Sequence, residues 1–381
     1  MSLYTTPLQF GYFFCLIMWI LFLVRGFRQQ RLSDKLLGWI MFILAMELQD
    51  YTFGFAGINV LWNELNGFPR GVSLLFGPVV YFYFRAQVDR SFRLRRVHLW
   101  HFFPYAFSFF YQLGAFVQGP EAVEAQQSSQ LFTILSISER FIRIASFVYY
   151  LSQCMIIYKR YRQWSYQQFS NPDLISFTWF RNFIYSMIFW LVFREVMNVM
   201  DAWLELAFYQ DWWWNLALAA TALYIGLAGY EQKQPAKIDF NLSQIKISNS
   251  DSSIHTSTSL EVTEESEKSS IAARIQELMK NDRLYLQADL NLQELAQHLQ
   301  INAVQLSATI NQVFNKNFND YINGLRIEEF IRLYKADVNQ KYTLLSIALD
   351  SGFNSKATFN RAFKKIKGSS PKEFLGENKE T

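Results

Sequence analysis

A run of basic side chains near the carboxyl end has the residue types that bind phosphate and read base edges. Between Ser351 and Pro371 the chain contains five lysine or arginine residues and no acidic residue. Lysine and arginine neutralise phosphate oxygens, and arginine can also donate two parallel hydrogen bonds to guanine. A charge run by itself is more often a solvated helix face. The five residues are Lys356, Arg361, Lys364, Lys365 and Lys367.

Two pairs of short helices are predicted to position these side chains. The first pair is an amphipathic helix at residues 292–299, then a turn at Ile301–Asn302 and a helix at residues 303–314 that Asn302 can cap. The second pair is residues 344–350 and a helix that Ser355 caps and that runs to about Ile366. Gly352 stands where the second turn needs a positive φ. Phe353, Phe359 and Phe363 are expected to form the core of this pair, and a helix at residues 321–334 is expected to join the pairs through its apolar stripe.

The run IALDSGFNSKATFNRAFKKIKGSSP resembles the second helix-turn-helix of AraC/XylS-type transcription regulators. The resemblance extends over about residues 270–374 and departs from the family pattern at Ala308, where a basic residue is usual, and at Asn315, where glycine is usual. Asn tolerates the left-handed conformation, so these departures concern base reading by the first pair more than its fold. The matching residues are Ile347, Ala348, Gly352, Phe353, Ser355, Phe359, Arg361, Phe363, Lys364, Gly368 and Pro371.

The resemblance implies a double-stranded DNA partner, with two recognition helices in successive major grooves about 34 Å apart. Small or neutral side chains on the first recognition helix favour base reading by the second. On the second helix the expected contacts are Lys356, Ala357, Thr358, Asn360 and Arg361 to bases, and Lys364, Lys365 and Lys367 to phosphates. On the first helix the corresponding positions are Val304, Gln305, Ser307, Ala308 and Asn311.

Residues 8–230 have the composition of membrane helices, because most of the 37 Phe, 20 Tyr and 11 Trp lie there. A helix needs about 20 apolar residues to cross the hydrocarbon core. Part of this region, LLFGPVVYFYFRA and HFFPY, also resembles membrane-bound bacterial members of the same family. The seven predicted spans are residues 8–24, 36–58, 71–84, 99–118, 131–158, 177–200 and 213–230.

The distribution of basic residues between these spans predicts their orientation. Lysine and arginine gather after the first, third and fifth spans, whereas the alternate loops contain almost none. The amino terminus is therefore expected outside the cell and the carboxyl terminus in the cytoplasm, where DNA is. We predict a multi-pass protein of the bacterial cytoplasmic (inner) membrane.

The expected architecture is all-α. A seven-helix transmembrane bundle at residues 1–230 is joined to an all-helical DNA-binding domain with two helix-turn-helix units at residues 270–381. Residues 231–269 are polar and serine-rich, so a flexible cytoplasmic linker is expected there.

Ionisable residues inside predicted spans are costly and usually functional. Two interpretations have about equal weight: internal ion pairs that hold the bundle together, or a ligand pocket for a small polar molecule that arrives from outside. His98 and His101 favour an interfacial position over a metal site, since no carboxylate or thiol lies near them in the sequence. The candidate pocket residues are Glu47, Asp50, Arg140, Arg143, Arg194 and Glu195.

The pattern as a whole favours a membrane-integrated one-component transcription regulator. Alternatives are a transporter or membrane enzyme with a regulatory tail, or a tail that binds protein. No phosphate-binding glycine loop, nucleophile with a nearby base, or metal-ligand cluster indicates catalysis, so neither enzyme activity, nor a cofactor, nor a metal is expected. Expected partners besides promoter DNA are the lipid bilayer, RNA polymerase, an unidentified membrane or small-molecule signal, and a second copy of the chain.

Overall fold

The chain folds into helices grouped in two compact units. The computed structural model describes residues 6–56, 65, 67–89, 91–171, 178–204, 212–231, 258–336 and 341–377. One unit comprises residues 1–159 and 177–242, and the other comprises residues 160–176 and 243–381. Within the described residues there is no strand, only an isolated bridge between Phe169 and Asn291, so the all-α prediction is confirmed.

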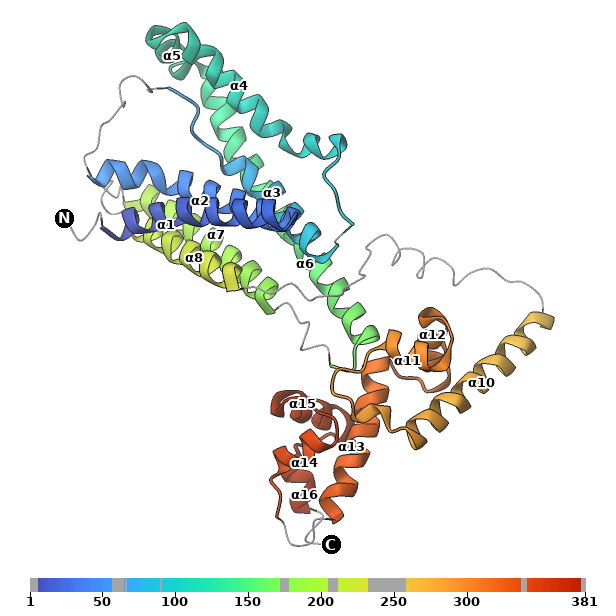
Figure 1. The fold of residues 1–381 in the computed structure, drawn as a ribbon. Coiled ribbons are helices and arrows are strands. Elements are labelled where there is room, and N and C mark those ends of the chain that lie inside the picture. The colour runs from blue at the N-terminus through green and yellow to red at the C-terminus, as the bar shows by residue number, and fades with distance from the viewer. Residues whose placement is uncertain are drawn as a thin grey trace. The chain divides into compact units, whose positions relative to one another are not determined.

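Each window predicted to span the membrane overlaps a helix of the described residues (Figure 1). The described part of this unit also contains η1, Arg96–Phe102, and a short helix α5, Pro120–Gln127, which the sequence pattern did not predict. The long helices are α1 Thr6–Arg28, α2 Leu32–Ala56, α3 Ser73–Val88, α4 Phe103–Gln118, α6 Gln130–Gln168, α7 Thr178–Leu204 and α8 Trp212–Glu231.

Small residues allow α1, α2 and α8 to pack closely. A Cβ at Gly11 would lie 2.9 Å from the Ala219 Cβ, so α1 and α8 approach at a point where only glycine fits. At the other end of α1, Arg25 forms an ion pair with Asp34 at 2.8 Å and donates to the Tyr230 carbonyl at 3.0 Å. One guanidinium therefore joins the ends of three helices.

Two helices of the described chain combine the length and hydropathy of a membrane span. They are Thr6–Arg28 and the stretch Thr178–Asp201. Helices α3 and α4 have 16 residues each and are shorter than a full crossing. The seven-span arrangement therefore stays a prediction.

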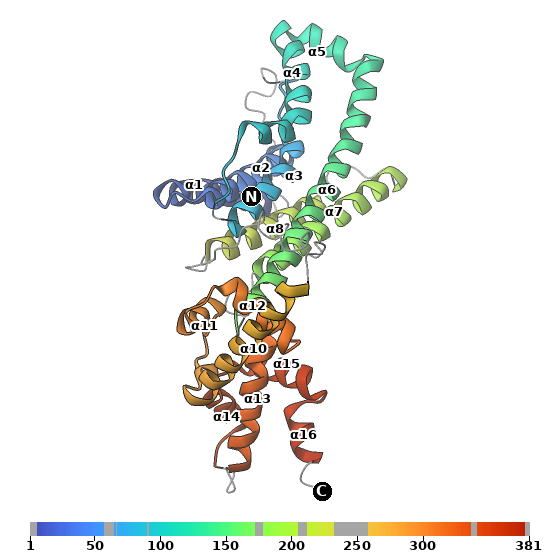
Figure 2. The same ribbon diagram turned by 90° about the vertical axis from the view of Figure 1, so that its right-hand side faces the viewer.

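The second unit places one long helix between two helix pairs, as Figures 1 and 2 show. Helices α11 Leu292–Leu299 and α12 Ala303–Val313 pack toward one end of α13, Phe318–Ala336. Helices α14 Leu344–Asp350, α15 Lys356–Lys367 and α16 Pro371–Glu377 lie toward its other end. Helix α10, Thr258–Asn281, and the short η4, Leu284–Leu286, precede the first pair.

Helix α10 differs from the sequence prediction. It begins at Thr258, so residues 258–269 are helical although we expected them in a flexible linker. The run TEESEK contains good helix formers, and their propensity prevails over the polar composition that suggested a linker. The earlier part of that predicted linker, residues 232–257, lies outside the described residues.

Two apolar cores support the helix pairs. One contains Ile275, Leu295, Leu306 and Ile310 and extends from Ile271 to Ile322. The other contains Phe330, Phe353, Phe359 and Phe363 and extends from Ile327 to Leu375. Both cores consist entirely of residues after 270, so the carboxyl-terminal part forms them without apolar residues from elsewhere in the chain.

Candidate nucleic-acid interface

The first helix pair is held by caps at both helix starts. The Asn291 side chain accepts from the Glu294 amide at 2.9 Å, and the Glu294 carboxylate accepts from the Asn291 amide at 3.2 Å. Asn302 accepts from the Val304 amide at 2.8 Å, which confirms it as the cap of α12. Gln300 takes a positive φ of 54° to turn the chain between the helices.

Helix α12 presents a neutral outer face. Val304 is 76% exposed, and Asn311 is also exposed. Gln305, Ser307 and Ala308 are half-buried at the edge of that face. Such side chains offer apolar or weak polar contacts to bases and no strong contact to phosphate.

The second pair follows its predicted turn chemistry. Thr343 caps α14, and Ser355 caps α15 by accepting from the Thr358 amide at 3.2 Å. Gly352 has φ +92°, and a Cβ there would lie 2.6 Å from the Tyr285 carbonyl oxygen. Glycine is thus required twice, for the backbone conformation and for the close approach of η4.

Helix α15 presents a basic outer face. Beneath it lie Phe359, Ala362 and Phe363, which are buried in the core. A base-reading surface needs this arrangement: a rigid helix whose outer side chains are free of the core. The exposed side chains are Lys356, Ala357, Asn360, Arg361, Lys364, Lys365, Ile366 and Lys367.

Thr358 does not belong to that face, contrary to the sequence prediction. It is 3% exposed, and its hydroxyl lies 2.9 Å from the Ser355 hydroxyl. Its position three residues after the cap turns it toward the helix start, so Thr358 supports the cap rather than reaching a base.

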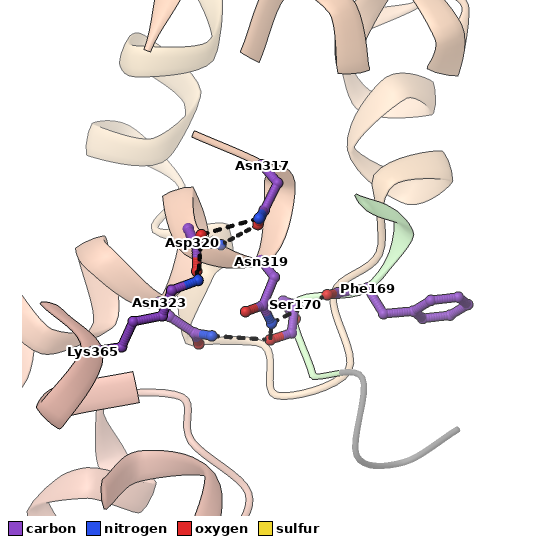
Figure 3. Close-up of polar contacts among 7 residues, drawn as sticks. All are labelled: Phe169, Ser170, Asn317, Asn319, Asp320, Asn323 and Lys365. Carbon is purple, nitrogen blue, oxygen red and sulfur yellow. Dashed lines mark hydrogen bonds and ion pairs between the residues drawn. The ribbon is translucent and has the colours of Figure 1, made fainter. Parts of the chain in front are cut away.

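Lys365 is held in place by an acid on another helix. Its Nζ lies 2.6 Å from one Asp320 carboxylate oxygen and 2.7 Å from the other (Figure 3). Asp320 is on α13, and its carboxylate also accepts from Asn317 at 3.0 Å. Lys365 therefore joins α15 to α13, and only part of its charge is available to phosphate.

The joining helix α13 is buried on most of its surface, more than the predicted apolar stripe implied. Arg326 is fully buried and donates to the carbonyls of Tyr285 and Gln287, both at 2.7 Å. Burial lowers the pKa of Arg326 to about 10, so its guanidinium remains charged at neutral pH. Sequence reasoning missed this residue because a charge within an apolar stripe is usually solvated.

A second polar cluster on α13 surrounds Glu329. The carboxylate accepts from Arg332 at 2.7 Å and from Arg283, which precedes η4. The hydrogen bond from Arg332 and the two guanidinium charges lower the pKa of Glu329. The cluster joins η4 to α13, one turn beyond Arg326.

Four of the candidate pocket residues in the first unit form ion pairs. Arg194 lies 3.8 Å from Glu47, and Arg140 lies 3.7 Å from Glu195. Arg143 is half-buried, and the Asp50 side chain is outside the described residues. These distances are those of ion pairs, and a ligand pocket at the same residues stays a prediction.

A separate pocket of about 240 Å³ lies against α3, α4 and α6. Apolar residues such as Leu74, Phe107 and Ile142 line it, together with Glu139, whose carboxylate accepts from Ser108 at 2.7 Å. The sequence analysis did not single out Glu139, although an acid in a predicted span was a signal for it. In the described part of the chain, no cluster of three His, Cys, Asp or Glu residues could hold a metal.

The comparisons with known proteins concern the second unit. Residues 295–377 match the family model of a helix-turn-helix domain of AraC type, which confirms the resemblance for those residues. An uncharacterized HTH-type transcriptional regulator of Staphylococcus aureus is 32% identical over 97 residues, 25% of this chain and 12% of that protein. Regulators of the strains COL and MSSA476 are each 31% identical over 97 residues. This chain thus spans 12% of the length of these relatives. No solved structure matches.

Proposed function

We propose that this protein is a membrane-integrated transcription regulator that binds promoter DNA through its carboxyl-terminal unit. The observation that carries the proposal is the exposed basic face of α15, set on a capped helix-turn-helix with its own core. The match of residues 295–377 to an AraC-type helix-turn-helix domain supports the same conclusion.

Sequence reading rests mainly on α15. Arg361 lies on its exposed face, where its guanidinium can reach the O6 and N7 atoms of guanine. Lys364 and Lys367, nearer the helix end, bind phosphates. Helix α12 has no lysine or arginine, so it adds apolar and weak polar contacts in the neighbouring groove.

The first unit is proposed to lie in the cytoplasmic membrane of a bacterium. Its outer surface supports this, because Phe10, Phe13 and Phe27 of α1 and Phe110 of α4 are each more than half exposed. Such apolar side chains suit lipid and are unfavourable in water. A signal enters through this unit, and the ionisable residues around Glu47 and Arg194 are the first candidates for its site. RNA polymerase and a second copy of the chain are proposed partners.

The test is selection of random duplex DNA by the fragment 258–381, which contains the whole of α10 and both cores. We expect a motif of two half-sites about one helical turn apart. Arg361→Ala should weaken binding by about 10-fold to 100-fold and remove the preference at one base pair.

Lys364→Ala is the matched control on the same exposed face. It should weaken binding equally for all sequences and reduce the salt dependence by about one counterion. Salt-sensitive binding that yields no motif would contradict a sequence-specific regulator.

A further inference from the structure

The end of α6 lies within the second unit, and the two residues that follow it contact α13 and the start of α11. Helix α6 is continuous from Gln130 to Gln168, and the residues from 160 onward group with the second unit. The next residues form backbone contacts with the start of α11. The Ser170 amide and hydroxyl both donate to the Leu290 carbonyl, at 3.2 and 2.6 Å, and Phe169 forms a bridge with Asn291.

Helix α13 contacts the same residues from the other side (Figure 3). The Asn319 side chain donates to the Ser170 carbonyl at 2.7 Å, and Asn323 donates to it at 3.4 Å. Arg326 donates to the Ser170 hydroxyl at 3.1 Å. The segment Phe169–Ser170, here called the docking segment, thus bridges α11 and α13.

The receiving site is a buried polar stripe on α13. Asn319, Asn323 and Arg326 stand at positions i, i+4 and i+7, which lie on one helix face. Each is at most 6% exposed, and Ser170 is fully buried. Buried amides need hydrogen-bond partners, and the docking segment supplies carbonyls to both asparagines. The stripe therefore has the chemistry of a site for a short stretch of polypeptide backbone.

Arg326 relays this contact to the second helix pair. Besides Ser170, it binds the carbonyls of Tyr285 and Gln287, and it lies 5.9 Å from the Phe353 ring centre. The Tyr285 carbonyl in turn abuts Gly352, the turn residue of the second pair. The turn of the second pair, η4, the joining helix and the docking segment thus meet around one buried guanidinium.

We propose that the docking segment sets the relative orientation of the two helix-turn-helix units and so links α6 to the spacing of DNA half-sites that the protein accepts. A continuous helix is a stiff element, and its last residue is next to the segment that docks. A shift of α6 acts through the docking segment on the start of α11 and, through Arg326, on the turn of the second pair. The inference rests on the proposed DNA-binding function.

The docking contact is tested in the full-length chain in lipid nanodiscs, without DNA. Ser170→Cys is combined with Asn323→Cys in a chain whose two buried thiols, Cys15 and Cys154, are replaced by alanine. A protease site inserted at residues 250–251 allows the two halves to be separated. Oxidation to a disulfide should join the fragments in this pair, because the two thiols would lie in one buried contact and no bulky reagent has to enter it. It should not join them with Ser170→Cys and Gln297→Cys, since Gln297 is an exposed residue of α11. Equal yields in the two pairs would overturn docking.

The coupling between the docking segment and half-site spacing is tested by DNA binding of the full-length chain. The native cysteines stay in place in this experiment. A one-base-pair insertion between half-sites should weaken wild-type binding by about tenfold, because it rotates one site away from its helix. The Ser170→Arg side chain cannot fit the buried site. In this variant the same insertion should reduce DNA affinity by less than about threefold. Gln167→Arg, an exposed change three residues earlier, should behave as wild type.

Each outcome of the second experiment has one meaning. A variant that is merely less stable loses affinity for both spacings equally, and an unchanged spacing penalty in Ser170→Arg overturns the coupling. Failure of the wild type to bind DNA at all would instead contradict the proposed function, while the crosslink would still report docking.

Discussion

At the scale of single residues, Arg326 is the side chain on which the second unit depends most. Arg326→Met in the fragment 258–381 removes the donors to the Tyr285 and Gln287 carbonyls. Buried carbonyls without a partner are costly, so we expect the free energy of unfolding to fall by about 2–4 kcal/mol. Urea unfolding followed by circular dichroism measures it.

Arg332→Met is the matched control for that substitution. Arg332 lies on the same helix, but its side chain is 59% exposed and its partner Glu329 keeps Arg283. Exposed ion pairs contribute little to the free energy of unfolding, so Arg332→Met should lower it much less than Arg326→Met. Equal losses would contradict a special role for the buried guanidinium.

Glu329 gives the fragment a defined pH dependence. Its folded-state pKa is lowered by Arg332 and Arg283, whereas in the unfolded chain it titrates near 4.3. Between the folded and unfolded pKa values the unfolded state therefore binds more protons than the folded state. The contribution of Glu329 to the free energy of unfolding is present above about pH 4.3 and is lost as pH falls through the lower folded pKa. Glu329→Gln should flatten the unfolding free energy between pH 5 and pH 3 relative to wild type. Parallel curves for the two proteins would refute this account.

At the scale of elements, the turn between α14 and α15 is the most constrained. Gly352→Ala should destabilise the fragment more than Gly368→Ala, by at least about 1 kcal/mol. Both glycines have positive φ, at 92° and 82°, so both substitutions carry the same backbone strain. Only at Gly352 would the new Cβ also collide with backbone, whereas nothing lies within 4 Å of a Cβ at Gly368. The difference between the melting curves of the two variants measures the cost of the steric clash at Gly352.

Local signals predicted the helices well, and long-range contacts escaped prediction. The caps at Asn302 and Ser355 and the positive φ of Gly352 depend on neighbouring residues, so the sequence contains them. The hydrogen bond between Arg326 and Ser170 joins residues that are 156 positions apart in the sequence. No local sequence pattern reveals such a contact, or the burial of Arg326 that goes with it. Thr358 was misplaced because counting forward from the cap does not say which side of the first turn faces the core.

At the scale of the whole molecule, the two units differ in how much apolar surface they leave exposed. The carboxyl-terminal unit buries its apolar side chains in two cores of its own. In the other unit, α1, α4 and α7 leave large apolar residues exposed, among them Phe13, Phe107 and Phe189. This exposed apolar surface is the basis on which we propose a lipid environment for the first unit.

Cysteine labelling tests the membrane orientation that the sequence predicts for that unit. The native thiols Cys15 and Cys154 are fully buried, so they give a low background in the intact protein. Ser128, between α5 and α6, is exposed and expected outside, whereas Ser91, in the basic loop after α3, is exposed and expected in the cytoplasm. In intact bacteria, an impermeant maleimide should label Ser128→Cys and spare Ser91→Cys until the membrane is permeabilised. The opposite pattern would place the carboxyl-terminal unit outside, away from DNA, and labelling of both sites in intact cells would contradict a spanning α4.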